Sequence, residues 1–205
     1  MTSFLHYFLG AIIFPRKAFR RLAADPRAVR QGFFAVLAAG VFLTLLSLVR
    51  GLLGGVPLVP VSAGGPPHNY YAWQMFFALP LLLATWMLSA AVLRFFTGGR
   101  AAGRGMSAAS GFALALPCLL AAVPHWGLAI LMLFGMPQAE GVAILSAPGP
   151  WQTAFLAVHG LAALWAWFLA AQAAAAGRKT PWGRSALAGL AAAAVEIAIF
   201  VVFVR

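Results

Sequence analysis

Five long apolar segments limit this chain of 205 residues to one class of fold. Each segment lacks Lys and Arg and is long enough to cross a hydrocarbon core of about 30 Å as a helix, which takes about 20 residues. No alternation of polar and apolar residues indicates a transmembrane strand. The sequence therefore predicts an all-α polytopic membrane protein, a bundle of five transmembrane helices within residues 31–205. The expected spans are Gln31–Val49, Tyr70–Leu93, Gly111–Gly135, Trp151–Ala176 and Ala186–Val204.

The composition excludes the main classes of soluble protein. Hydrophobic residues make up 63% of the chain and charged residues only 8%, whereas a soluble domain averages about 25% charged residues. So few charged side chains cannot cover the surface of a cytosolic enzyme. Cys118 is the single cysteine, which excludes an internal disulfide and a cysteine metal cluster.

The basic residues indicate the orientation of the bundle. The chain carries 14 Lys and Arg against 3 Asp and Glu, a net charge of +11. All of the basic residues except Arg50 and Arg205 lie before the first span, between the second and third, or between the fourth and fifth. The positive-inside rule then places the N-terminus in the cytoplasm and the C-terminus outside. Abundant Ala, Gly, Arg and Pro suggest a high-GC bacterial source, and hence the bacterial inner membrane.

Residues 1–30 are predicted to form a cytoplasmic interfacial segment. Phe4–Phe14 is too short to span the membrane and has no basic region before it, so we expect it to lie at the interface rather than to act as a signal peptide. The following stretch predicts a short amphipathic helix with Phe19 and Leu22 on one side, ended by Asp25 and Pro26. No nucleic-acid partner is expected, because the basic residues flank apolar segments. The candidate contacts for anionic lipids or for another membrane or cytoplasmic protein are Arg16, Lys17, Arg20 and Arg21, with Arg100, Arg104, Arg178 and Lys179 of the later basic loops.

Glu196 is the most informative single residue. It lies near the middle of the fifth span, where an ionisable group costs at least a few kcal/mol. Gly189, Ala192 and Ala193 share its helical face. Small residues allow close packing against a neighbouring helix. We therefore expect Glu196 to point into the bundle, either protonated or paired.

Two histidines add to this candidate intramembrane polar cluster. His125 in the third span and His159 in the fourth both lie among alanines, within about two helical turns of the expected midplane. A cluster of His125, His159 and Glu196 could relay protons or bind a divalent metal. The alternative is structural: the histidines bond to backbone carbonyls and Glu196 pairs locally. No two of these residues have the spacing of a helical ligand pair, so we predict no metal or cofactor.

No pattern in the chain predicts catalysis. The glycine-rich loop at residues 98–105 lacks the preceding strand and the Gly-Lys-Ser/Thr ending of a phosphate-binding loop. No Ser-His-Asp set and no pair of carboxylates is evident. We therefore predict a protein without enzyme activity and without catalytic residues.

Three motifs resemble those of the Yip1 family of five-span membrane proteins, in its bacterial branch. They are Pro15-x-x-x-Phe19-x-x-Leu22 before the first span, the basic Gly98-Gly99 loop leading to Pro117 and Pro124, and the stretch from Gly177 to Ser185-Ala186. The resemblance implies a five-span architecture. Together with the charge pattern, it favours a non-enzymatic protein that organises membrane proteins or lipids. The alternative is a small transporter or channel that uses Glu196, His125 and His159.

Overall fold

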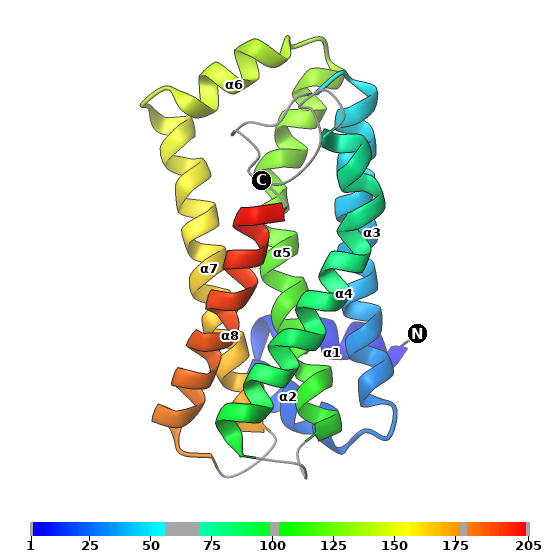
Figure 1. Cartoon of the computed structure of the whole chain (residues 1–205), viewed down its shortest axis with the longest axis vertical. Coiled ribbons are helices and arrows are strands. Elements are labelled where there is room, and N and C mark those ends of the chain that lie inside the picture. Colours follow the sequence, from blue (N-terminus) through cyan, green and yellow to red (C-terminus); the bar gives the residue numbers. More distant parts are fainter. Residues whose placement is uncertain (1, 56–69, 99–102, 177–179, 204–205) are drawn as a thin grey trace.

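The computed structural model describes residues 2–55, 70–98, 103–176 and 180–203, and in these ranges it is a bundle of α-helices without strands (Figure 1). Five helices are long and apolar enough to cross a membrane, as predicted. The all-α polytopic fold is thereby confirmed. The five spans are α3 (Ala28–Leu52), α4 (Tyr70–Thr97), α5 (Gly103–Leu133), α7 (Pro150–Ala176) and α8 (Trp182–Phe203).

The helices are longer than most of the predicted apolar segments. The helix α3 begins at Ala28 rather than Gln31, and α5 begins at Gly103 rather than Gly111. A helix continues past a change from apolar to polar residues as long as its backbone hydrogen bonds continue. Gly54 follows α3 and Gly135 follows α5, both with positive φ, +69° and +93°. Glycine adopts this conformation without steric cost and so ends a helix. Val204, the last residue of the predicted fifth span, lies outside the described residues.

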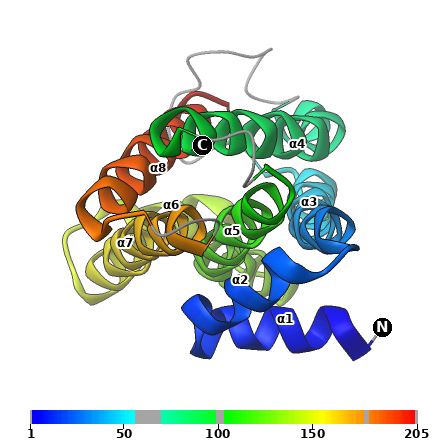
Figure 2. The same cartoon turned by 90° about the horizontal axis from the view of Figure 1, so that it is seen from below.

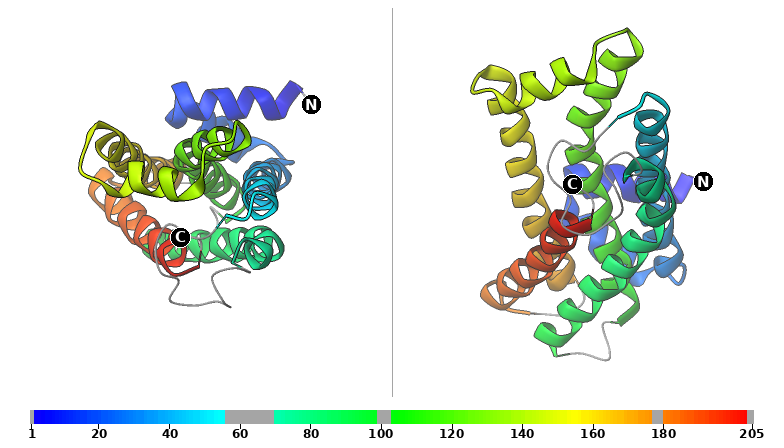
Figure 3. Two further views of the ribbon diagram at one scale, coloured as in Figure 1. Left: turned by 90° about the horizontal axis from the view of Figure 1, so that it is seen from above. Right: turned by 45° about the horizontal axis from the view of Figure 1, so that its top comes forward.

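A short helix between the third and fourth spans was not among the predicted elements. This helix, α6 (Gln138–Ser146), begins after Pro137 and carries Glu140 in its first turn, where an acidic side chain suits the helix dipole. It lies across one end of the bundle, between α5 and α7 (Figure 3). We call this end of the bundle the α6 end.

The helix α5 lies at the centre of the bundle. Its most apolar stretch is 78% buried, against 28–39% for the other four spans. It packs between α3 and α7 and also contacts α4, while α8 packs between α4 and α7 (Figure 2). Glycines bring α3 and α5 together, because a Cβ atom on Gly111 would lie 2.6 Å from the carbonyl oxygen of Gly32. Only glycine permits this approach of the two backbones.

Two N-terminal helices, α1 (Thr2–Ile13) and α2 (Pro15–Ala24), run across the bundle axis near the end opposite α6 (Figures 1 and 2). Among the described residues, every Lys and Arg except Arg50 belongs to α2 or to the parts of the chain that meet at this end. We call it the basic end. Its helices are joined by side-chain bonds: Arg94 of α4 donates to Ser107 of α5, and Arg184 Nε of α8 donates to the Phe96 carbonyl at 2.5 Å.

A candidate intramembrane binding cavity

A cavity of about 570 Å³ lies inside the bundle, toward the α6 end. It is bounded by α3, α4, α5, α7 and α8, and Val142 and Leu145 of α6 contribute to its wall. At the basic end, by contrast, every residue of α5 from Gly105 to Ala113 is buried. The bundle is therefore tightly packed in one half and hollow in the other.

Small side chains on α5 and α7 leave the space that forms the cavity. Its wall includes Ala121 and Ala122 of α5, and Ala162, Ala163 and Ala166 of α7. An alanine wall cannot fill the distance between helices that diverge, so the space stays open. The helix α8 contributes only its later turns, Glu196–Val201. In Figure 1, α8 ends well below the top of its neighbours.

His125 and His159 meet on the cavity wall. Their ring centroids are 5.4 Å apart in an edge-to-face arrangement, and Phe155 packs against both, 4.3 Å from the His159 ring and 5.4 Å from that of His125. His159 Nδ1 lies 2.8 Å from the carbonyl oxygen of Phe155. A carbonyl only accepts hydrogen bonds, so Nδ1 carries the proton. In the neutral ring, Nε2 is then an acceptor available to another group.

Glu196 lines the same cavity and is buried in the bundle, with 3% of its surface exposed. This confirms that the residue points inward. Its small-residue face packs as predicted, because a Cβ atom on Gly189 would lie 2.5 Å from the backbone nitrogen of Ala171 on α7. The Ser89 hydroxyl of α4 is buried and has no hydrogen-bond partner among the described residues.

The three predicted cluster residues therefore come together only in part. The histidines contact each other, whereas no hydrogen bond or ion pair joins Glu196 to either of them in the described part of the chain. In the same part of the chain, no group of three His, Cys, Asp or Glu side chains could hold a metal ion. The shared feature of the three residues is the cavity.

Arg50 is a charged residue of the cavity wall that the sequence did not predict. It directly follows Val49, the last residue of the first predicted span, but it lies within α3, is 2% exposed and lines the cavity. Its guanidinium carbon lies 4.6 Å from the ring centroid of Tyr71 on α4. One signal was available in the sequence: Arg50 is one of the two basic residues, with Arg205, that depart from the charge asymmetry.

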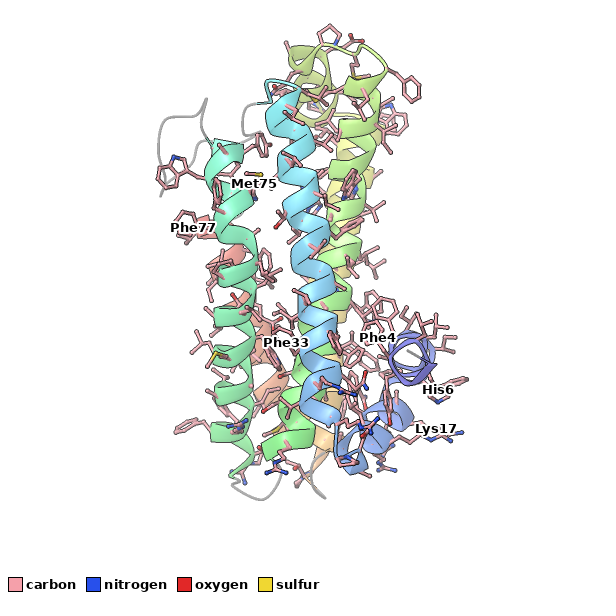
Figure 4. All side chains as sticks on the ribbon, turned by 90° about the vertical axis from the view of Figure 1, so that its right-hand side faces the viewer. Phe4, His6, Lys17, Phe33, Met75 and Phe77 are labelled. Carbon is pink, nitrogen blue, oxygen red and sulfur yellow. The ribbon has the colours of Figure 1, made fainter. Side chains whose placement is uncertain are left out.

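The predicted basic surface is only partly described. Phe19 and Leu22 of α2 are each 1% exposed and belong to the core, while Arg16, Lys17, Arg20 and Arg21 are exposed. The helix α2 packs against α5 and α7, so this amphipathic helix is fixed to the bundle. Figure 4 shows Lys17 directed away from the spans. Arg104 is exposed near the start of α5. Arg100, Arg178 and Lys179 lie outside the described residues.

The helix α1 is fixed by aromatic packing and one hydrogen bond. Phe4 points toward the spans, with its ring centroid 6.0 Å from that of Phe112 and 6.5 Å from that of Phe34 (Figure 4). The Tyr7 hydroxyl donates to Asp25 at 3.1 Å. Burial, and next this hydrogen bond to the carboxylate, raise the pKa of Tyr7 above its ordinary value. The outer side of α1 exposes Leu5, Leu9, Ile12 and Ile13, which suits a helix at the membrane interface.

Comparisons with known proteins identify no relative of this chain. No protein-family model, curated protein or solved structure matches the chain. The five helices that are long and apolar enough to cross a membrane support an integral membrane protein.

Proposed function

We propose that this chain is a non-enzymatic membrane protein that binds a small ligand inside its helix bundle and acts as a carrier for it. The observation that carries the proposal is that Arg50, His125, His159 and Glu196, from four different spans, line one cavity. Its volume of about 570 Å³ falls within the range of roughly 300–1,000 Å³ that is usual for small-molecule sites. A mostly apolar wall with a few polar groups is also typical of such sites.

The central helix offers a place for movement. Pro117 lies on the cavity wall within α5, and Pro124 follows within the same helix. A proline removes one backbone hydrogen bond and is a common point of bending. A carrier must change the access to its site, and a bend in α5 would move the wall that faces α3 and α7.

The test is to extract the full-length protein in native-lipid nanodiscs and to identify bound small molecules by mass spectrometry. Ala163→Phe places a large ring in the cavity, and Ala157→Phe places the same ring on the exposed side of α7. We expect a bound compound to be lost from Ala163→Phe and kept by Ala157→Phe. A compound profile that is identical in the two variants would contradict the proposal.

Transport is tested separately, in proteoliposomes loaded with the compound so identified. Glu196→Gln removes the ionisable group and keeps the shape of the side chain. We expect it to abolish flux while the protein stays folded and monodisperse. Unaltered flux in Glu196→Gln would exclude Glu196 as a transport residue. If the wild-type protein itself shows no flux, the carrier function is excluded.

A second function is favoured by the packing of α2. Because Phe19 and Leu22 are buried against the bundle, the exposed Arg16, Lys17, Arg20 and Arg21 form a fixed basic surface. With the N-terminus in the cytoplasm of a bacterium, this surface would meet the anionic inner leaflet and organise lipids or another membrane protein there. The resemblance to the Yip1 family supports the same role.

Native mass spectrometry of retained lipids tests this second function. Replacing the four basic residues by Gln should reduce the number of retained anionic lipids, because each basic residue near an anionic surface contributes about 1 kcal/mol. The matched control exchanges Arg and Lys at the same four positions and so keeps the charge. Equal lipid retention in the Gln variant and the control would reject this surface as a lipid contact.

A further inference from the structure

Arg50 presents two unused hydrogen-bond donors at the cavity. Its Nε and Nη2 atoms are buried and have no hydrogen-bond partner among the described residues, and the whole residue is 2% exposed. These two nitrogens lie on the same edge of the guanidinium plane. That edge is the fork that binds both oxygens of a carboxylate or of a phosphate.

The surroundings of Arg50 provide no anion for this fork. The chain has three acidic side chains. Asp25 accepts bonds from Tyr7 and from the backbone of Arg27 at the basic end, and Glu140 is exposed on α6. Glu196 lines the same cavity as Arg50, but no ion pair or hydrogen bond joins the two side chains in the described part of the chain. The Arg50 guanidinium contacts the ring of Tyr71, which carries no charge when its hydroxyl is protonated. A buried guanidinium without a counter-charge is costly, so the position is suited to an anion from outside the chain.

Tyr71 leaves the fork accessible. The guanidinium carbon lies over the Tyr71 ring, 4.6 Å from its centroid. This contact leaves Nε and Nη2 without a hydrogen-bond partner among the described residues. The Arg50 side chain is thus oriented by one neighbour while its donors remain available to another.

The rest of the cavity is suited to an apolar chain. Beyond Arg50, the wall includes Leu43 and Leu46 of α3, Leu114 of α5, and Ile197, Phe200 and Val201 of α8. A free inorganic anion would leave this apolar surface uncovered. A ligand that uses both the fork and the wall needs a charged head and an apolar body.

We infer that the cavity binds a single-chain amphiphile whose carboxylate or phosphate head group is held by Nε and Nη2 of Arg50. The apolar chain occupies the space between α3, α5, α7 and α8. This inference rests on the proposed ligand-binding function and specifies the class of ligand.

The probes are four compounds titrated against the full-length protein in nanodiscs of zwitterionic lipid, with occupancy read by native mass spectrometry. Tetradecanoic acid and tetradecyl phosphate carry the two acidic head groups on one chain length. Tetradecanol keeps the chain without the charge, and inorganic phosphate keeps the charge without the chain. We expect saturable binding of one or both acidic amphiphiles, and binding of tetradecanol and of inorganic phosphate that is weaker by about tenfold or more.

The variants separate the head-group contact from the chain site. Arg50→Gln should weaken the binding of the acidic amphiphile by about tenfold or more, because it removes the charge and the fork. Arg50→Lys keeps the charge without the fork and should recover only part of the affinity. Arg30→Gln removes an exposed arginine of the same helix at the basic end and serves as the control with unchanged binding. Ala163→Phe, which leaves Arg50 intact, should abolish binding even if Arg50→Gln does not fold.

Each other outcome overturns a defined part of the inference. If tetradecanol binds as tightly as the acidic amphiphiles, or if Arg50→Gln binds them with full affinity, Arg50 does not hold the head group. If inorganic phosphate binds as tightly as tetradecyl phosphate, the ligand is not an amphiphile. If Arg50→Gln keeps binding and Ala163→Phe loses it, the ligand-binding function stands and only the assignment of Arg50 fails. If neither variant alters binding, both proposals fail.

Discussion

The guanidinium carbon of Arg50 on α3 lies 4.6 Å from the centre of the Tyr71 ring on α4. Both side chains are buried, and both line the cavity. The pair joins two neighbouring spans at the α6 end, where the bundle is otherwise hollow. A cation over an aromatic face contributes about 0.5–1 kcal/mol at exposed sites and about 2 kcal/mol when desolvated.

Replacing the ring of Tyr71 should therefore destabilise the α6 end. We expect Tyr71→Leu to lower the free energy of unfolding by about 1–2 kcal/mol, because the buried Arg50 loses the aromatic face. Tyr71→Phe retains the ring and should have less than half of that effect. Thermal unfolding of both variants in the same nanodiscs measures the difference. Equal losses would assign the effect to the hydroxyl group instead.

The contact of α3 with α5 should tolerate no side chain at Gly111. A Cβ atom there would lie 2.6 Å from the carbonyl oxygen of Gly32, so Gly111→Ala should cost about 1–3 kcal/mol of stability through overpacking. Gly127 provides a control in the same helix, because a Cβ atom there meets nothing within 4 Å. Gly127→Ala should be neutral or stabilising by about 0.5–1 kcal/mol, since glycine weakens helices.

These two variants are compared by the midpoint of thermal unfolding. A matched decrease in both would mean that the loss is not specific to the close approach of α3 and α5. Normal stability of Gly111→Ala would contradict the packing described here.

Glu196→Gln should leave the stability of the bundle unchanged or raise it. The Glu196 carboxyl is buried and forms no ion pair within the described ranges. A neutral amide of the same shape removes the cost of burying a charge. Glu196→Ala is the comparison, and it should be less stable because it enlarges the cavity. A clear loss of stability in Glu196→Gln, seen by thermal unfolding, would indicate that the charged carboxylate has a structural partner.

The docking of α1 onto α2 should weaken at alkaline pH. The pKa of Tyr7 is raised by burial and by its hydrogen bond to Asp25. The folded state therefore favours the neutral phenol, and its stabilising contribution is complete below the ordinary tyrosine pKa of about 10. That contribution is lost as the pH rises through the raised pKa of Tyr7.

Tyr7→Phe should abolish this alkaline dependence and cost less than about 1 kcal/mol at neutral pH. The measurement is the unfolding midpoint of both proteins from neutral pH to above the tyrosine pKa. The two membrane-embedded tyrosines, Tyr70 and Tyr71, are unchanged in the variant, so only the difference between the curves reports Tyr7. Parallel curves at all pH values would exclude Tyr7 as the titrating group.

The sequence by itself determined the number of spans, the amphipathic α2 and the inward direction of Glu196. These features depend on local patterns: the length of apolar runs, the three-residue spacing of Phe19 and Leu22, and the small residues on one face of α8. Each of these patterns lies within a single helix. A helix in a membrane forms all the hydrogen bonds of its own backbone. Its existence and its apolar faces can therefore be predicted without knowledge of its neighbours.

Only the tertiary structure shows that the polar residues of different spans line one cavity. His125 contacts His159, and Arg50 contacts Tyr71, across consecutive spans that pack side by side around the cavity. The place of Arg50 on the cavity wall could not be predicted, because the sequence does not show that α3 continues to Leu52 or that α4 begins beside it. Helix crossing depends on packing between side chains of different segments. That packing exists only after the helices have assembled.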